Sequence, residues 1–158
     1  MIDVSMLVSL KSSESHDLKH EKSYFSANPS KGKVINWPIL TDLINPDCEC
    51  SSICKSMVRK GKWDSDDVPK KVKQLRAWLE TPTTPPTVIY LHCEAGVDRT
   101  GEVAGSYLMQ YKNETYQQCW NFNNHIENRQ MSKESRNGLR WYAYYVKYNL
   151  GGNPGPIC

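Results

Sequence analysis

The stretch from Thr87 to Gly101 reads TVIYLHCEAGVDRTG and decides the fold of the chain. Its first five residues are β-branched, aromatic or aliphatic without interruption, which is typical of a strand covered on both faces. Mostly polar residues and glycine follow, and residues 101–111 read as a buried helix in which Ala104 and Gly105 allow close packing. We therefore predict a strand, a loop at its carboxyl end, and a helix.

The flanking segments predict the rest of an α/β domain. Residues 34–40 form a short apolar run broken by Pro38, which reads as a strand. Helices are expected from Ser65, over residues 115–129 and after a Ser132 cap. The apolar faces of the first and last of these helices are Val68, Val72, Leu75 and Leu79, and Leu139, Tyr142, Ala143 and Val146. This order of elements is typical of an α/β sandwich.

Length and composition predict a single domain. The chain has 158 residues, of which 39% are hydrophobic and 23% charged, and this balance excludes wholesale disorder. Residues 1–33 show no apolar periodicity after position 10, so we expect a poorly ordered N-terminal arm. Residues 34–150 would form the domain, and residues 151–158, rich in Gly and Pro, a C-terminal tail.

Net charge and hydropathy limit the classes of partner that the chain is expected to bind. A formal net charge of +3 is too weak to predict nucleic-acid binding, and no apolar run is long enough to span a membrane. A basic stretch offers a rim for polyphosphates or for peripheral contact with an anionic membrane; its residues are Lys55, Arg59, Lys60, Lys62, Lys70, Lys71 and Lys73. The first ten residues do not match a secretion signal, so we expect a cytoplasmic protein.

The loop between strand and helix carries the candidate chemistry. Five residues separate Cys93 from Arg99, and a loop of this length before a helix can wrap its backbone N–H groups around one phosphate. The same field is expected to lower the pKa of Cys93 and favour a nucleophilic thiolate. Arg99 offers a planar fork for two phosphoryl oxygens, Gly96 leaves room for the ligand, and Thr100 can hydrogen-bond the thiolate.

This loop resembles the signature of the cysteine-dependent phosphatase superfamily, which is His-Cys, five residues, then Arg-Ser or Arg-Thr. The resemblance covers about residues 64–148 and implies a phosphatase-like central sheet flanked by helices, with a minimal N-terminal part. It implies that Cys93 is the nucleophile, that Arg99 clamps the phosphate, and that His92 orients the loop. No metal or other cofactor is implied. The phosphate cradle would be the backbone amides of Glu94, Ala95, Gly96, Val97, Asp98 and Arg99.

Two substrate classes fit this loop. The run from His92 to Gly96 is similar to the loop of cysteine phytases, and Asp98-Arg99-Thr100 is similar to myotubularin and Sac-type phosphoinositide phosphatases. Both comparisons favour a phosphorylated inositol. The alternative is a phosphoprotein substrate of an atypical tyrosine or dual-specificity phosphatase. Because Glu94 and Asp98 repel an anion, their side chains are expected to point away from the phosphate or to serve another purpose.

A phosphatase of this kind needs a general acid for the leaving oxygen. Asp42 follows an apolar strand and Pro38, and resembles the acid of dual-specificity phosphatases. Asp64 and Asp66 lie in a segment that resembles the Trp-Pro-Asp loop of tyrosine phosphatases, and they are the alternative. If no acid works, the chain would be a pseudophosphatase that binds a phosphorylated partner without turnover.

The chain has six cysteines, and the role of those outside the loop is a second question. Cys48, Cys50 and Cys54 are either free thiols, disulfide partners of Cys119 or Cys158, or thiolates of a structural zinc site. The last two interpretations would make this region a stapled interaction domain. Such a cysteine content is unusual in the cytosol, so a secreted or luminal protein is the alternative localisation.

Overall fold

The first strand of the chain, β1 (Ile2–Ser5), is the centre of a three-stranded parallel sheet with the order β2-β1-β3. The computed structural model describes residues 1–10, 12–41, 44–46 and 51–157, and these form a single α/β domain with six helices. The other strands are β2 (Lys33–Asn36) and β3 (Ile89–His92). The helices are α1 (Ser12–Ala27), α2 (Ser51–Arg59), α3 (Val68–Glu80), α4 (Asp98–Tyr111), α5 (Tyr116–Glu127) and α6 (Lys133–Asn149).

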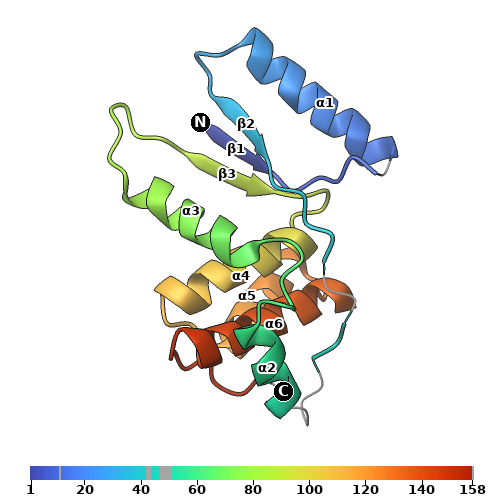
Figure 1. Ribbon diagram of the computed structural model, residues 1–158. Helices are drawn as coiled ribbons and strands as arrows, with labels where there is room; N and C mark the ends of the chain where they lie inside the picture. Colours follow the sequence, from blue (N-terminus) through green and yellow to red (C-terminus); the bar gives the residue numbers. More distant parts are fainter. Residues whose placement is uncertain (11, 42–43, 47–50, 158) are drawn as a thin grey trace.

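The helices lie on both sides of the sheet (Figure 1). Helix α1 covers one face, and α3 and α4 cover the other, with α5, α6 and α2 packed beyond them. Successive side chains of a pleated strand point to opposite faces of the sheet, so each strand contributes residues to both sides. Ile2 and Val4 point into the main core, whereas Asp3 and Ser5 point towards α1.

The prediction that residues 1–33 form a poorly ordered arm was wrong. Val4 and Met6 are completely buried, and β1 pairs with both other strands. In α1, the positions turned towards the sheet are Glu14, Leu18, Glu21 and Phe25, of which Glu14 is fully buried and Glu21 half-buried. Two of these four positions are carboxylates, so the helix shows no hydrophobic period in the sequence.

The interpretation of residues 87–91 as a strand covered on both faces was also wrong. β3 pairs only with β1 among the described strands and lies at an edge of the sheet. Ile89 and Leu91 pack against the core, but Tyr90 is 56% exposed. The run is uniformly apolar in sequence although only one of its faces is covered.

The predicted helices are present with different bounds: α3 begins at Val68 instead of Ser65, α4 begins at Asp98, and α5 covers Tyr116–Glu127. Ser132 caps α6 by accepting a hydrogen bond from the Ser135 amide, and all four predicted inward residues of α6 are buried. In α3, Val68, Val72 and Leu75 are buried, but Leu79 is exposed. No helix in the described part of the chain is both long and apolar enough to cross a bilayer.

Replacing Met6 with alanine tests the place of the N-terminal segment in the core. Met6 is fully buried, so we expect Met6→Ala to lower the free energy of unfolding by about 2–5 kcal/mol, measured by urea denaturation. Met1→Ala is the matched control, because Met1 is 47% exposed and its truncation should change stability by less than about 0.5 kcal/mol. Equal stability of the two variants would contradict the central position of β1.

Candidate active site

Cys93 lies where the structure turns from the carboxyl end of β3 towards α4 (Figure 1). Its thiol is free and 6% exposed. The loop reverses at Gly96, whose φ of +76° favours glycine, and the first α4 backbone bond runs from the Gly101 amide to the Val97 carbonyl. The amides that precede Gly101 in the first turn therefore have no partner within the helix and can accept an anion.

Arg99 is fixed by a helix that the sequence did not connect with it. Its Nη1 donates to the Met6 carbonyl at 3.1 Å and to Oε2 of Glu14 at 2.7 Å, and its Nη2 donates to Oε1 of Glu14 at 3.1 Å. Glu14 also accepts the Val8 amide at 2.8 Å. The ion pair is buried, with 11% of the Arg99 side chain and none of the Glu14 side chain exposed.

These contacts hold one edge of the guanidinium and leave the other available. Nε and the second Nη2 hydrogen lie side by side on the edge that neither Met6 nor Glu14 uses. That edge is the fork that binds two phosphoryl oxygens. Burial by itself would lower the pKa of Arg99, but the hydrogen bonds and charge of Glu14 outweigh it and raise the pKa, so the group stays cationic.

A cavity of about 380 Å³ opens beside Arg99. Glu94 and Asp98 border it from the loop, and Leu40 and Thr41 border it from the segment after β2. The remaining lining residues are Val8, Leu10, Ile39, Ser132, Glu134 and Ser135. The cavity thus brings the predicted phosphate loop, the end of the predicted acid loop and the first turn of α6 to one place.

The two acidic side chains of the loop have different surroundings. Asp98 accepts Nη2 of Arg129 at 2.8 Å and the Ser132 amide at 2.6 Å. Burial opposes ionisation of Asp98, but these two donors lower its pKa and balance its charge. Glu94 is largely exposed, with Oε2 3.8 Å from Nη2 of Arg99. Asp98 thus binds Arg129 and the Ser132 amide while also bordering the cavity.

The three candidates for the general acid lie in different places. Asp42 lies outside the described residues, but Thr41, which precedes it, lines the cavity. Oδ1 of Asp64 accepts the Val68 amide at the start of α3, and Oδ2 of Asp66 accepts the amides of Leu40 and Thr41. Neither Asp64 nor Asp66 lines the cavity, and Cys93 does not line it either.

His92 and Thr100 occupy the two ends of the loop. Nδ1 of His92 lies 3.3 Å from the Cys93 carbonyl, and Nε2 lies 3.0 Å from Oδ1 of Asp3 and 3.7 Å from Oε1 of Glu21. These contacts orient the ring, as the predicted role requires. Thr100 Oγ1 is buried and has no hydrogen-bond partner within the described residues, which leaves it available to a thiolate.

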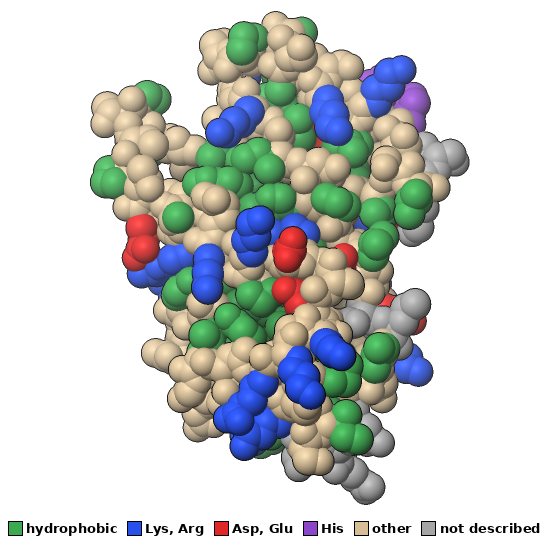
Figure 2. Space-filling model, in the orientation of Figure 1, with side chains coloured by type: hydrophobic (Ala, Val, Ile, Leu, Met, Phe, Trp, Pro, Cys, Tyr) green, Lys and Arg blue, Asp and Glu red, His purple; other side chains and the backbone are tan. Residues whose placement is uncertain are grey.

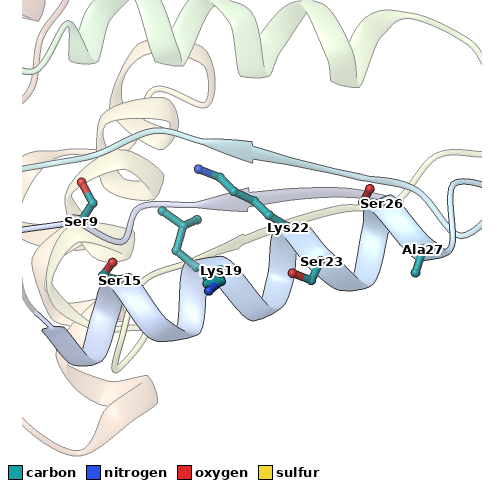
Figure 3. Close-up of a pocket in the computed structure, with 8 residues that line it drawn as sticks. Ser9, Ser15, Lys19, Lys22, Ser23, Ser26 and Ala27 are labelled. Carbon is teal, nitrogen blue, oxygen red and sulfur yellow. The ribbon is translucent and has the colours of Figure 1, made fainter.

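A larger hollow lies elsewhere on the molecule (Figure 3). It is an open groove of about 710 Å³ along α1, and its lining residues are Ser9, Ser15, Leu18, Lys19, Lys22, Ser23, Ser26 and Ala27. The lining contains hydroxyls and two amines but no thiol, imidazole or carboxylate. We therefore place the chemistry at the smaller cavity beside Arg99.

The part of the basic stretch in α2, Lys55 and Arg59, lies away from this cavity. Basic side chains gather over the lower part of the molecule, where α2 lies (Figure 2). The Val58 carbonyl accepts Asn149 at the carboxyl end of α6, whereas Ser132 and Ser135 line the cavity at its amino end. The length of α6 separates the two places by about 24 Å. The predicted rim is therefore not supported for the residues of α2.

The cysteines outside the loop are buried where the structure describes them. Cys119 is a free thiol that donates to the Gly105 carbonyl, and burial raises its pKa to about 12. It forms no disulfide with Cys54, the member of the cysteine run that the structure describes. Cys54 is buried in α2. Cys48, Cys50 and Cys158 lie outside the described residues.

The main residues that sequence reasoning missed are the partners of the loop. They are Asp3, Glu14, Glu21, Arg129 and Glu134. A signal existed for three of them. Residues 2–5 alternate between apolar and polar, as a strand does, and Glu14 and Glu21 are seven residues apart, which places them on one face of a helix. No local pattern identifies Arg129 or Glu134.

Comparison with known proteins adds no relative: no family model matches the chain, and neither the curated proteins nor the solved structures contain a match.

Removing the charge of Glu14 tests the anchor of Arg99. Glu14→Gln leaves a buried guanidinium without its counter-charge, so we expect the free energy of unfolding to fall by about 3–5 kcal/mol in urea denaturation. Glu80→Gln is the control, because the Arg76–Glu80 pair on α3 is exposed and its loss should have little effect. A Glu14→Gln protein as stable as this control would show that the ion pair does not anchor the loop.

Proposed function

We propose that this chain is a cysteine-dependent phosphatase that hydrolyses phosphate monoesters through a cysteinyl-phosphate intermediate. The observation that carries the proposal is the guanidinium of Arg99, which lines the cavity and which Glu14 and Met6 hold on one edge. A surface arginine would not need a fully buried carboxylate to fix it. Cys93 lies at the start of this loop, and the negative charge of its thiolate helps to raise the pKa of Arg99.

The first step is attack of the Cys93 thiolate on phosphorus. The S–P bond forms as the ester P–O bond breaks, and the leaving oxygen takes a proton from a carboxylic acid. The amides of the first turn of α4 and the open edge of Arg99 bind the three phosphoryl oxygens, whose charge they stabilise in the transition state. Positioning and electrostatics thus supply most of the catalysis.

The second step is hydrolysis of the cysteinyl-phosphate. Water attacks phosphorus, the same carboxylate takes its proton, and the S–P bond breaks to return the thiolate and release inorganic phosphate. Thr100 can hydrogen-bond the departing sulfur with its otherwise unpartnered hydroxyl. The reaction consumes one water for each monoester and uses no cofactor.

The cavity favours a phosphorylated protein side chain over an inositol polyphosphate. Among the described residues that line it, Arg99 is the cationic one, and Glu94, Asp98 and Glu134 are acidic. Several additional phosphates would meet carboxylates instead of lysines. The walls contributed by Val8, Leu10, Ile39 and Leu40 are apolar and suit the body of a phosphorylated side chain.

Phosphate release by the reduced protein tests the activity. We expect turnover with phosphotyrosine or phosphoserine peptides, slower release from inositol hexakisphosphate and phosphoinositides, and loss of turnover in Cys93→Ser. Cys119→Ser is the matched control, because Cys119 is also a buried free thiol but lies in α5. It should retain activity.

Two results would contradict this function. Turnover that survives in Cys93→Ser would remove the cysteinyl-phosphate. Retention of labelled substrate without release of phosphate would replace the enzyme with the alternative, a pseudophosphatase that binds a phosphorylated partner. A burst of one phosphate for each protein, followed by no turnover, would place the failure in the second step.

The position of Thr41 predicts that Asp42 is the general acid. We expect Asp42→Asn to reduce kcat by about 10²–10⁴-fold and to flatten the alkaline side of the pH profile, because the proton donor is lost. Asp67→Asn is the control, since Asp67 is exposed and its φ of +54° is well tolerated by asparagine. Equal kcat values for the two variants would exclude Asp42 and direct the search to Glu134, which lines the same cavity.

A further inference from the structure

Three potential metal ligands meet on the face of the sheet that α1 covers. Asp3 comes from β1, Glu21 from α1 and His92 from the end of β3. One ligand atom from each lies within 4.8 Å of the other two. The three come from the three elements that must come together before the catalytic loop can form.

The tautomer of His92 decides what Nε2 offers to the carboxylates. The Cys93 carbonyl only accepts, so its 3.3 Å contact with Nδ1 is a hydrogen bond in the tautomer that carries the proton on Nδ1. In that neutral tautomer Nε2 presents a lone pair to Oδ1 of Asp3 at 3.0 Å and to Oε1 of Glu21 at 3.7 Å. Three electron pairs that converge in this way repel one another unless a cation lies between them.

The surroundings of the carboxylates are a further sign of a missing partner. Asp3 is 5% exposed, and Nε2 of His92 at 3.0 Å from its Oδ1 is no donor when the ring proton lies on Nδ1. Oε2 of Glu21 is also buried and accepts no hydrogen bond within the described part of the chain. Buried carboxylate oxygens without donors are costly, and a bound cation would satisfy both.

We propose that Asp3, Glu21 and His92 form a binding site for a divalent transition metal of the Zn²⁺ type. One imidazole and two carboxylates suit Zn²⁺ better than Mg²⁺, which prefers oxygen ligands alone. Metal–ligand bonds of about 2.0–2.2 Å allow ligand atoms to be roughly 3–4 Å apart, which agrees with the distances from Nε2. The backbone carbonyl that accepts from Nδ1 is a typical outer partner of a metal-bound histidine.

The metal would act as a structural clip and not as a reactant. It would join β1, α1 and β3 immediately before Cys93 and hold the His92 ring in the orientation that positions the loop. The catalytic steps proposed above pass through the thiolate and do not use it. Metal binding and phosphate release are measured separately, so either proposal can fail alone.

Zinc retention by the reduced full-length protein tests the site. After equilibrium dialysis against Zn²⁺, we expect Asp3→Asn and Glu21→Gln each to weaken binding at one site by at least about tenfold. Asp17→Asn, an exposed acid on the same helix, should bind as the unchanged protein does. Circular dichroism of each variant shows whether it folds, and Zn²⁺ should raise the Tm of the unchanged protein but not of Glu21→Gln.

Cobalt distinguishes this site from the cysteines. The difference in absorption between the Co²⁺-loaded protein and Co²⁺-loaded Glu21→Gln should contain ligand-field bands but no thiolate-to-cobalt charge-transfer band. Equal metal retention by folded Asp3→Asn, Glu21→Gln and the unchanged protein would overturn the proposal. It would show that a proton on Nε2, making an imidazolium, is all that lies between the carboxylates. A thiolate band in the difference spectrum would overturn it in favour of a cysteine site.

Discussion

The structure depends on the buried ion pair between Glu14 and Arg99. The two residues are 85 positions apart and join the first turn of α1 to the first turn of α4. Desolvation of two charges is expensive, and a buried pair of this kind often contributes no more stability than apolar residues of the same volume would. Its presence is better explained by position, because it sets the plane of a guanidinium next to the loop and leaves one edge of that guanidinium open.

Helix α1 holds both ends of the loop. Glu14 binds Arg99 at the end of the loop, and Glu21 lies beside His92 at its beginning. The two carboxylates are two helical turns apart, so one rigid helix determines the span that the loop must bridge. The loop between them contains Gly96, whose positive φ turns the chain. A helix with a weak apolar face is thus kept in place largely by the polar groups that it positions.

The sequence predicts those parts of the structure whose characteristic residues lie close together in the chain. The strand, loop and α4 could be predicted because Cys93, Gly96 and Arg99 are close in the chain and each of them has one chemical role in a phosphate-binding loop. The central strand was missed because Ile2–Ser5 is short, and α1 because carboxylates occupy half of its inward face. The exposed face of β3 could not be predicted from Tyr90, because the position of α1, and not the strand's own residues, decides whether that face is covered. Pairings such as Asp98 with Arg129 need the fold itself.

The charge balance around the loop indicates how it would select a ligand. Glu14 offsets the charge of Arg99, and Arg129 offsets that of Asp98, so the loop has little net positive charge of its own. A site that attracted anions by charge alone would bind a polyphosphate most tightly, but this one depends on directed N–H donors. Directed donors distinguish the geometry of the transition state from that of the bound ester better than a diffuse charge does. In the proposed phosphatase, the buried carboxylate behind Arg99 would therefore reduce general affinity for anions and increase selectivity for one phosphoryl group in one orientation.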